Sequence, residues 1–257
     1  MMSEAILFEH IGEIDSTNAE LSRRIAAQTL ASAPACLSAD IQTSGRGRRG
    51  RSWLNTDGAI MMSLACDTSG IASENLPLIS IAAALGVHDA ISKLLAHTAV
   101  KWPNDVVCTD QGYLEKLCGI LCELVFAPSG AAFAVIGIGI NANCETLPKM
   151  LMMPAASLRI KLGKSVDTEA LKRQIASAVL DRLSLLRCDP QTLVCEYSRR
   201  CATLGNSVAA TDLTGKTVCE GTARRILSDG RLVIETENGE AIVDAADVSI
   251  RTKLCSE

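Results

Sequence analysis

The residues with the most distinctive chemistry form an arginine- and glycine-rich run between two apolar segments. Residues 45–51 read GRGRRGR and place Arg46, Arg48, Arg49 and Arg51 within six positions. Glycines let a backbone approach a ligand closely, and guanidinium groups form paired hydrogen bonds with carboxylates and phosphates. We expect an anion-binding loop that stays loosely ordered until its ligand offsets the repulsion between the arginines. The alternative is a solvated charge run or an RNA-binding arginine tract.

A single lysine opens the apolar segment KLCGILCE. Alternation along a strand predicts that Lys116 shares a face with Cys118, Ile120 and Cys122. A buried ammonium needs an anionic partner, so this lysine is a candidate ligand-binding group, and Gly119 leaves room beside it. The alternative is a lysine whose apolar stem carries the charge to solvent.

Two further polar motifs interrupt apolar segments. In KWPND, residues 101–105, proline stops a strand and leaves an amide and a carboxylate at its end, although Asn and Asp also suit ordinary turns. Both tryptophans, Trp53 and Trp102, lie beside polar motifs, which is a mild indication of a site. A large ring at Trp53 would wall a ligand cavity next to the arginine loop.

Residues 15–18, DSTN, open a helix in which Thr17 and Glu20 fit a capping box. These small donors and acceptors also suit the recognition of a polar ring. GIGINAN, residues 137–143, has the glycine spacing of a dinucleotide fingerprint, but no phosphate-facing helix follows it, so we read a tightly packed strand that ends at Asn141.

Composition excludes several classes of protein. The 257 residues are 48% hydrophobic, which predicts a folded core, and the net charge of −4 with 3% aromatic residues disfavours a nucleic-acid-coating surface. Eleven cysteines without paired metal-ligand spacing predict reduced thiols and no metal site made of side chains. We see no secretory signal, membrane span, P-loop or catalytic triad, so we expect a cytoplasmic protein.

Hydrophobic periodicity predicts strands and helices followed by a run of short strands. The change near residue 205 predicts a domain at 1–204 and a small barrel at 205–257. The expected strands are 6–14, 36–42, 59–65, 100–102, 105–108, 116–126, 132–140, 207–210, 217–227, 232–235 and 241–243. The expected helices begin near 16, 75, 167 and 189, and the second runs to about residue 96.

Taken in order, DSTN, QTSGRGRRGRSW, KWPND, KLCGILCE and GIGINAN resemble the motifs of biotin protein ligases over almost the whole chain. The resemblance implies an α+β fold, with a mixed sheet and helices like class II aminoacyl-tRNA synthetase cores, followed by an SH3-like barrel. Some family members carry an N-terminal DNA-binding domain. DSTN begins here at residue 15, so we expect the single-function form, with no DNA or membrane partner.

The implied reaction has two steps. Biotin and ATP form biotinyl-5′-AMP and pyrophosphate, with Mg²⁺ on the phosphates, and a lysine of a biotin carboxyl carrier protein of a carboxylase then displaces AMP. The implied catalytic residues are Lys116, Arg48 and Asp105. Arg48 and Lys116 would hold the carboxylate and phosphate, and Asp105 would position the incoming lysine and take its proton. We expect a monomer or a homodimer.

The resemblance also assigns binding roles. The implied biotin-binding residues are Ser16, Thr17, Asn18, Gln42, Arg46, Gly47, Arg48, Lys116 and Gly119. The implied ATP-binding residues are Arg48, Arg49, Arg51, Trp53, Asn104, Lys116, Asn141 and Arg251.

Two rival functions remain. A lipoate protein ligase would share the fold and the chemistry, but lipoate's dithiolane needs an apolar slot, whereas Ser16, Asn18 and Gln42 offer the donors and acceptors that a ureido ring needs. A non-enzymatic nucleotide- or RNA-binding module would use the arginine loop alone. The negative net charge and the few aromatic residues disfavour that module.

Overall fold

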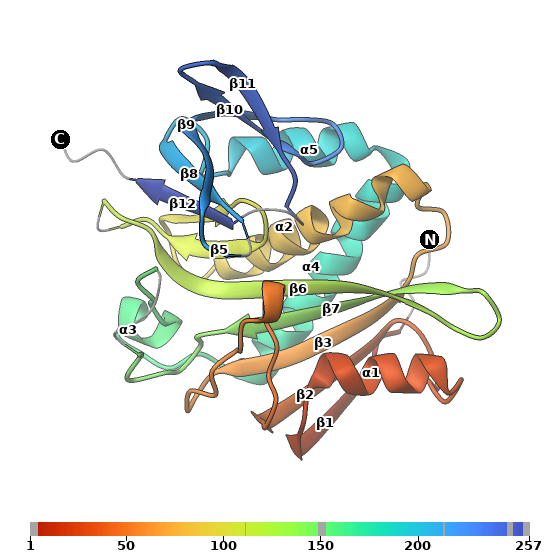
Figure 1. Cartoon of the computed structure of the whole chain (residues 1–257). Helices are drawn as coiled ribbons and strands as arrows, with labels where there is room; N and C mark the ends of the chain where they lie inside the picture. Colours follow the sequence, from red (N-terminus) through yellow and green to blue (C-terminus); the bar gives the residue numbers. More distant parts are fainter. Residues whose placement is uncertain (1–4, 111, 149–152, 213, 246–248, 254–257) are drawn as a thin grey trace.

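The computed structural model describes residues 5–110, 112–148, 153–212, 214–245 and 249–253, in the last of these the backbone alone. Both strands and helices occur before residue 200, and only strands follow among the described residues (Figure 1). The strands are β1 (Leu7–Ile14), β2 (Ala35–Gln42), β3 (Ile60–Asp67), β4 (Thr98–Lys101), β5 (Asp105–Cys108), β6 (Glu115–Phe126), β7 (Ala132–Ile140), β8 (Ser207–Thr211), β9 (Thr217–Ile226), β10 (Leu232–Thr236), β11 (Gly239–Val243) and β12 (Ser249–Lys253). The helices are α1 (Thr17–Ala26), α2 (Ile79–Ile91), α3 (Leu158–Leu162), α4 (Thr168–Cys188) and α5 (Pro190–Arg199), with 3₁₀ turns η1 (Arg48–Gly50) and η2 (Ser73–Leu78).

The larger sheet has seven strands in the order β1-β2-β3-β7-β6-β5-β4. Only β1 and β2 pair in parallel, and the other neighbours are antiparallel. The long hairpin of β6 and β7 forms the centre, with Phe126 opposite Ala132 at the turn. The central strands therefore carry the polar motifs of residues 116–123 and 137–141 side by side.

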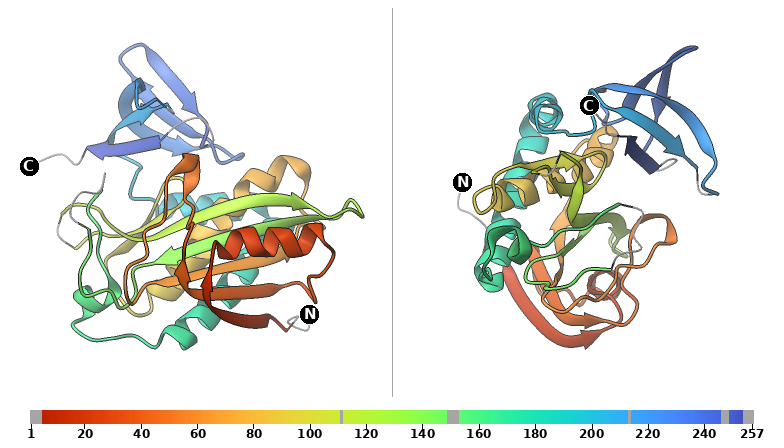
Figure 2. Two further views of the ribbon diagram at one scale, coloured as in Figure 1. Left: turned by 60° about the horizontal axis from the view of Figure 1, so that its bottom comes forward. Right: turned by 90° about the vertical axis from the view of Figure 1, so that its left-hand side faces the viewer.

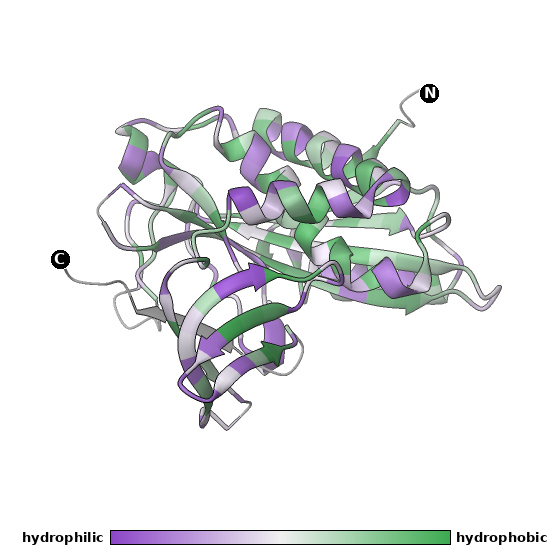
Figure 3. Cartoon of the chain, turned by 90° about the horizontal axis from the view of Figure 1, so that it is seen from above, coloured by the Kyte–Doolittle hydropathy of each residue, from purple (hydrophilic) through white to green (hydrophobic). Residues whose placement is uncertain are grey.

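The two faces of this sheet are covered differently (Figures 1 and 2). Helices α2 and α4 pack against each other and against one face, where α2 is buried along nearly its whole length. The single helix α1 covers part of the opposite face, over β2, β3, β6 and β7. In Figure 3 the central strands are mainly hydrophobic, whereas hydrophilic segments recur along the helices. The second face keeps an uncovered part, where the cavity lies.

The C-terminal strands form a five-stranded antiparallel sheet in the order β11-β10-β9-β8-β12. It packs beside the β4–β5 end of the larger sheet (Figure 2). The indole Nε1 of Trp102 donates to the carbonyl of Gly230 over 2.9 Å, and Trp102 itself is fully buried. Trp102 therefore joins the two sheets and does not itself line the cavity, whereas its motif neighbours Lys101, Asn104 and Asp105 do.

The expected fold class, a mixed sheet with helices followed by a small β domain, is confirmed. Four details differ. The expected helix from residue 75 to 96 begins as a 3₁₀ turn around Pro77, and α2 spans only Ile79–Ile91. The α1 cap is Ser16, which accepts from the Ala19 N–H, so the capping box proposed at Thr17 is wrong. The sequence patterns also missed α3 and β12. Across the described residues, no helix is long and apolar enough to cross a bilayer.

Candidate active site

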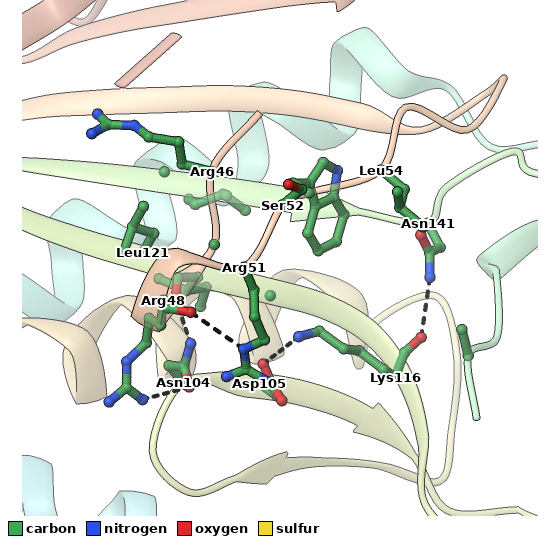
Figure 4. A pocket seen from close by; sticks show the side chains of 18 of the residues that line it. Arg46, Arg48, Arg51, Ser52, Leu54, Asn104, Asp105, Lys116, Leu121 and Asn141 are labelled. Atoms are coloured by element: carbon green, nitrogen blue, oxygen red, sulfur yellow. Dashed lines mark hydrogen bonds and ion pairs between the residues drawn. The ribbon is translucent and has the colours of Figure 1, made fainter. Parts of the chain in front are cut away.

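A cavity of about 610 Å³ opens on the uncovered face of the larger sheet. A volume of this size suits a small-molecule substrate. It gathers nearly all the candidate site residues from segments far apart in the sequence (Figure 4). Those on its wall are Ser16, Thr17, Asn18, Gln42, Arg46, Gly47, Arg48, Arg51, Trp53, Asn104, Asp105, Lys116, Gly119 and Asn141.

Three glycines on adjacent strands make this face hollow. Gly119 of β6 lies opposite Gly139 of β7, and Gly137 lies two residues before Gly139 on the same face of β7. A Cβ at Gly139 would come within 2.4 Å of the Trp53 ring, and one at Gly137 within 2.4 Å of Asn18 Oδ1. The glycines in GIGINAN therefore admit side chains from α1 and from the arginine loop onto the sheet.

The arginine loop folds back over the cavity as a short hairpin. The Trp53 N–H donates to the Gly45 carbonyl over 3.0 Å, and the Gly47 N–H donates to the Arg51 carbonyl over 2.6 Å. Arg48 Nη1 donates to Asn104 Oδ1 over 2.9 Å, which links the loop to the KWPND motif. The loop and this motif thus place cationic groups over the middle of the cavity.

At the tip of the loop the chain turns away from the cavity. Arg49 has a φ of 61°, in the left-handed region, and is not on the cavity wall. Its Nη1 donates to the Thr211 carbonyl over 3.0 Å, and Arg48 Nη2 donates to the Ala245 carbonyl. Arg49 therefore contacts the C-terminal domain instead of the expected nucleotide side, and the side chain of Arg251 lies outside the described residues.

Lys116 and Asp105 form an ion pair on the cavity wall, with 2.8 Å between Nζ and Oδ1. Lys101, buried and also on the wall, is the cross-strand neighbour of Asp105. Burial alone would raise the pKa of Asp105, but the charges of Lys116 and Lys101 outweigh it and hold that pKa below the usual range. Sequence reasoning missed Lys101, although it begins the KWPND motif.

The strand alternation predicted for Lys116 is wrong. The register between β5 and β6 shifts after Val106, so that Val106 faces Cys118 and Val107 faces Lys116. Leu117 is the extra residue, a β-bulge, and it is buried like Cys118. The bulge turns Lys116 to the glycine face, where its Nζ lies within 2.8 Å of the position a Gly119 Cβ would take.

The backbone of Lys116 is held from both sides. Asn141 Nδ2 donates to the Lys116 carbonyl over 3.2 Å and to the Ala156 carbonyl over 3.1 Å. The Lys116 N–H donates to the Pro154 carbonyl over 2.8 Å. Asn141 therefore positions Lys116 in addition to lining the cavity.

The polar end of the cavity is a set of hydrogen-bonded side chains from α1 and β2. The Thr17 N–H donates to Gln42 Oε1 over 2.8 Å, and Arg46 Nη2 lies 3.2 Å from Glu123 Oε2. Asn18 Nδ2 donates to the same Glu123 oxygen over 2.7 Å. Glu123 was not among the residues predicted from the sequence.

The wall also has an apolar part. Trp53 packs on Gly119 and Gly139, as expected of a ring beside the loop, and its buried Nε1 finds no hydrogen-bond partner among the described residues. Tyr113 and Leu114 join the wall from the turn between β5 and β6. A planar, partly polar ring fits such a surface.

One acidic group elsewhere resembles a cation site, formed by Cys108, Asp110 and Glu115 within the searched, described residues. Lys161 already occupies it, since its Nζ lies 3.0 Å from Asp110 and makes a short ion pair with Glu115. This group therefore holds α3 against the sheet.

Burial raises the pKa of the Cys118 thiol, so this thiol stays protonated and contributes only to the packing of the core.

Comparison with known proteins decides the family. The profile of the biotin/lipoate A/B protein ligase family matches residues 12–141, about half of the chain, and the profile of the biotin protein ligase C-terminal domain matches residues 203–251. The biotin–[acetyl-CoA-carboxylase] ligase of Mycobacterium tuberculosis is 32% identical over 248 residues, which cover 93% of this chain and 86% of that one. The chain belongs to the biotin/lipoate A/B protein ligase family.

Other members of the biotin/lipoate ligase family extend the match. The bifunctional ligase/repressor BirA of Escherichia coli is 30% identical over 230 residues, 87% of this chain and 68% of that one. The structure of a biotin protein ligase from Aquifex aeolicus in complex with biotin and ATP superposes with a TM-score of 0.81 at 25% identity, covering 96% of this chain and 99% of that one.

Proposed function

We propose that this chain is a biotin–protein ligase, which activates biotin as biotinyl-5′-AMP and transfers the acyl group to a carrier lysine. One observation carries the proposal. A single cavity joins a polar end suited to a ureido ring, around Thr17 and Gln42, to a cationic middle around Lys116 and Arg48. The relatives named as biotin ligases support the same substrate.

In the first step an oxygen of the biotin carboxylate attacks the α-phosphorus of ATP, and the bond to pyrophosphate breaks. The reacting groups are both anionic, so the barrier includes their repulsion. An unlike charge pair at about 4 Å is worth about 4 kcal/mol at an effective dielectric constant of 20. Arg48 and Lys116 would supply such pairs, with Arg51 on the cavity wall beside them.

Substrate binding would exchange the partners of Lys116. Its Nζ is held by Asp105 at 2.8 Å, and an incoming carboxylate or phosphate would compete for it. Once Lys116 turns to the substrate, Asp105 would be available to the ammonium of the carrier lysine. In the second step that amine, after losing a proton, attacks the acyl carbon, an amide forms and AMP leaves.

The low pKa of Asp105 bears on its role as a base. While Lys116 and Lys101 face it, this carboxylate accepts a proton poorly. We therefore propose Asp105 first as the group that orients the carrier ammonium. Proton transfer to Asp105 would follow only after Lys116 has moved away.

Mg²⁺ would accompany ATP as part of the substrate. Among the described residues on the cavity wall, Asp105 is the single carboxylate, and Lys116 engages it. The cavity thus offers phosphate-binding cations and no set of hard oxygen ligands for a resident ion. Bound Mg²⁺ would supply further charge neutralisation on the phosphates.

Lipoate is the second candidate substrate because the family is named for ligases of both biotin and lipoate. The buried polar end favours biotin, because a dithiolane would leave unused the acceptor of Thr17 Oγ1 and the donors of Gln42 Nε2 that face the ligand. The deciding experiment is ATP–pyrophosphate exchange with biotin, lipoate or neither added. Exchange that depends on biotin supports the proposal, and exchange that depends on lipoate alone overturns it.

The remaining assignments are also proposals. The acceptor would be a biotin carboxyl carrier domain of a carboxylase, because the Mycobacterium relative is named for acetyl-CoA carboxylase. We propose a catalytic domain at 1–204 and a C-terminal domain at 205–257, a monomer or homodimer, and no DNA-binding role. Ten described cysteines are free thiols, which suits a reducing, cytoplasmic location.

A further inference from the structure

Two polar residues that do not line the cavity, Ser63 and Glu123, are hydrogen-bonded to the residues that do. We infer that Ser63 and Glu123 fix the direction of hydrogen bonding at the polar end and make the Thr17 hydroxyl an acceptor for a ring N–H of the substrate. This inference rests on the proposed function, because it assigns the atoms that distinguish the ureido ring. Both would be positioning residues that act through Asn18 and Thr17.

Glu123 sets the direction of the hydrogen bonds at the polar end of the cavity. Asn18 Nδ2 lies 2.7 Å from Glu123 Oε2 and 3.4 Å from the Leu121 carbonyl oxygen. The carboxylate, which also binds Arg46, and the carbonyl can only accept. The Asn18 amide must therefore donate toward β6, and its Oδ1 must point the other way.

The next two hydrogen bonds then have one possible direction. Ser63 Oγ lies 2.6 Å from Asn18 Oδ1 and must donate to it. The only hydroxyl proton of Ser63 is used there, so in the 2.6 Å contact between Thr17 Oγ1 and Ser63 Oγ the proton comes from Thr17. The longer contact, 3.1 Å from Thr17 Oγ1 to Gln42 Oε1, receives no proton from this hydroxyl.

The result is a fixed pattern on the cavity wall. The Thr17 hydroxyl has only lone pairs left for a ligand. Gln42 Oε1 is taken by the Thr17 N–H at 2.8 Å, so Gln42 offers its Nε2 donors. The backbone of Gln42 is fixed by Asn55, through bonds of 3.1 and 2.6 Å. An acceptor beside a donor complements an N–H beside a carbonyl, as in a ureido ring.

Burial keeps this pattern from rearranging. Ser63 is fully buried, and Thr17 and Asn18 are 3% and 4% exposed. Gly137 leaves the room that Asn18 Oδ1 occupies. The printed contacts give the set two charged members, Glu123 and its partner Arg46. Because each hydroxyl has one proton, reversing one bond would require reversing all of them.

The experiment measures ligand preference. The probes are biotin and its two cyclic carbamate analogues, in each of which one ring N–H is replaced by oxygen. We compare their kcat/KM in ATP–pyrophosphate exchange for the wild type, Ser63→Ala and Glu123→Gln. The matched control is Ser38→Ala, which also removes a buried hydroxyl from the larger sheet but at a site off the cavity wall.

In Ser63→Ala the Thr17 hydroxyl loses the acceptor that fixed its proton, so this proton is no longer held away from the ligand. Gln42 Oε1, at 3.1 Å and already accepting the Thr17 N–H, is the weaker competing acceptor. The preference for biotin over one carbamate analogue should fall about tenfold, the usual effect of one hydrogen bond to a buried group. Glu123→Gln should shift the preference in the same direction but less, since the Leu121 carbonyl still holds Asn18. Ser38→Ala should retain the wild-type preference.

The outcomes separate the two proposals. If the wild type shows no biotin-dependent exchange, the proposed function fails. If the wild type is active and both variants keep its preference, the inference is overturned and the function stands. If Ser63→Ala does not fold, the preference of Glu123→Gln decides, because that side chain is 30% exposed and its replacement keeps its shape.

Discussion

Lys116 and Asp105 meet at 2.8 Å because a β-bulge turns Lys116 onto the face of the sheet where β5 presents Asp105. If the same residues formed a regular strand without the bulge, the lysine would share a face with Cys118 and lie in the buried core. The pair holds an ammonium in the middle of the cavity, between the arginine loop and Asn141. One irregularity in one strand therefore sets where the ammonium charge lies in the cavity.

Lys116→Met should remove the first chemical step and leave the fold intact. Methionine keeps the length and apolar stem but offers no charge to the carboxylate and phosphate. Loss of one preorganised charged donor typically costs about 10²–10³ in rate, so biotin-dependent ATP–pyrophosphate exchange should fall by at least about a hundredfold. The exposed Lys164 gives the matched control, Lys164→Met, which should leave exchange unchanged. Near-normal exchange in Lys116→Met would show that Lys116 is not a catalytic residue.

Asp105→Asn should lower stability in a pH-dependent way. The substitution leaves Lys101 and Lys116 facing each other without a counter-charge, at a cost of about 3 kcal/mol. The pKa of Asp105 is lowered by folding, so its contribution is present above the ordinary aspartate pKa of about 3.9 and is lost as pH falls through the lower folded value.

Thermal unfolding of the wild type and Asp105→Asn at a series of pH values measures this contribution. The difference in Tm should be constant between about pH 7 and 5 and should shrink below about pH 4. Asp181→Asn, an exposed change on α4, serves as control and should show no difference. A Tm difference that does not change down to the lowest pH would contradict the ion-pair account.

The sequence patterns predicted most of the secondary structure, and nearly all of the chosen residues meet in one cavity. A run of arginines and glycines such as GRGRRGR predicts an anion-binding loop from its own residue types, without knowledge of distant contacts. The bulge at Leu117 could not be predicted, because it depends on how β6 pairs with β5. Simple alternation therefore put Lys116 on the wrong face.

The remaining misses have the same cause. Thr17 fits a helix cap by local spacing, yet its hydroxyl bonds to Ser63, which is 46 residues away in the sequence. Glu123 looks like an ordinary polar residue of a strand until folding brings it beside Asn18 and Arg46. Arg49 looks like its neighbours in the loop, but the backbone turn directs it to the C-terminal domain.

Two glycines on β7 offer a matched pair of substitutions that separates the two substrates. In Gly137→Ala the added Cβ would lie 2.4 Å from Asn18 Oδ1, at the proposed biotin end. In Gly139→Ala it would lie 2.4 Å from the Trp53 ring, at the proposed nucleotide end. Such overpacking typically costs about 1–3 kcal/mol, so the first should raise KM for biotin, and the second KM for ATP, each by about tenfold.

Steady-state ATP–pyrophosphate exchange, with the concentration of biotin and of ATP varied in turn, measures both KM values. Because the changes are identical in chemistry and two residues apart, a general loss of stability would affect both substrates in both variants. If Gly137→Ala and Gly139→Ala raise the same KM, the assignment of biotin and nucleotide to the two ends is wrong.

Arg48→Gly should let the adenylate escape before it reaches the carrier. Arg48 links the arginine loop to Asn104, because its Nη1 donates to Asn104 Oδ1 over 2.9 Å. Its Nη2 donates to the Ala245 carbonyl of the C-terminal domain. Removing the guanidinium breaks both links and takes a positive charge from the phosphate of the intermediate. Incubation with biotin, ATP and an unrelated lysine-rich protein should therefore label that protein, whereas the wild type and the exposed control Arg231→Gly should not. If the variant retains biotinyl-5′-AMP through gel filtration and leaves the unrelated protein unlabelled, Arg48 does not close the cavity.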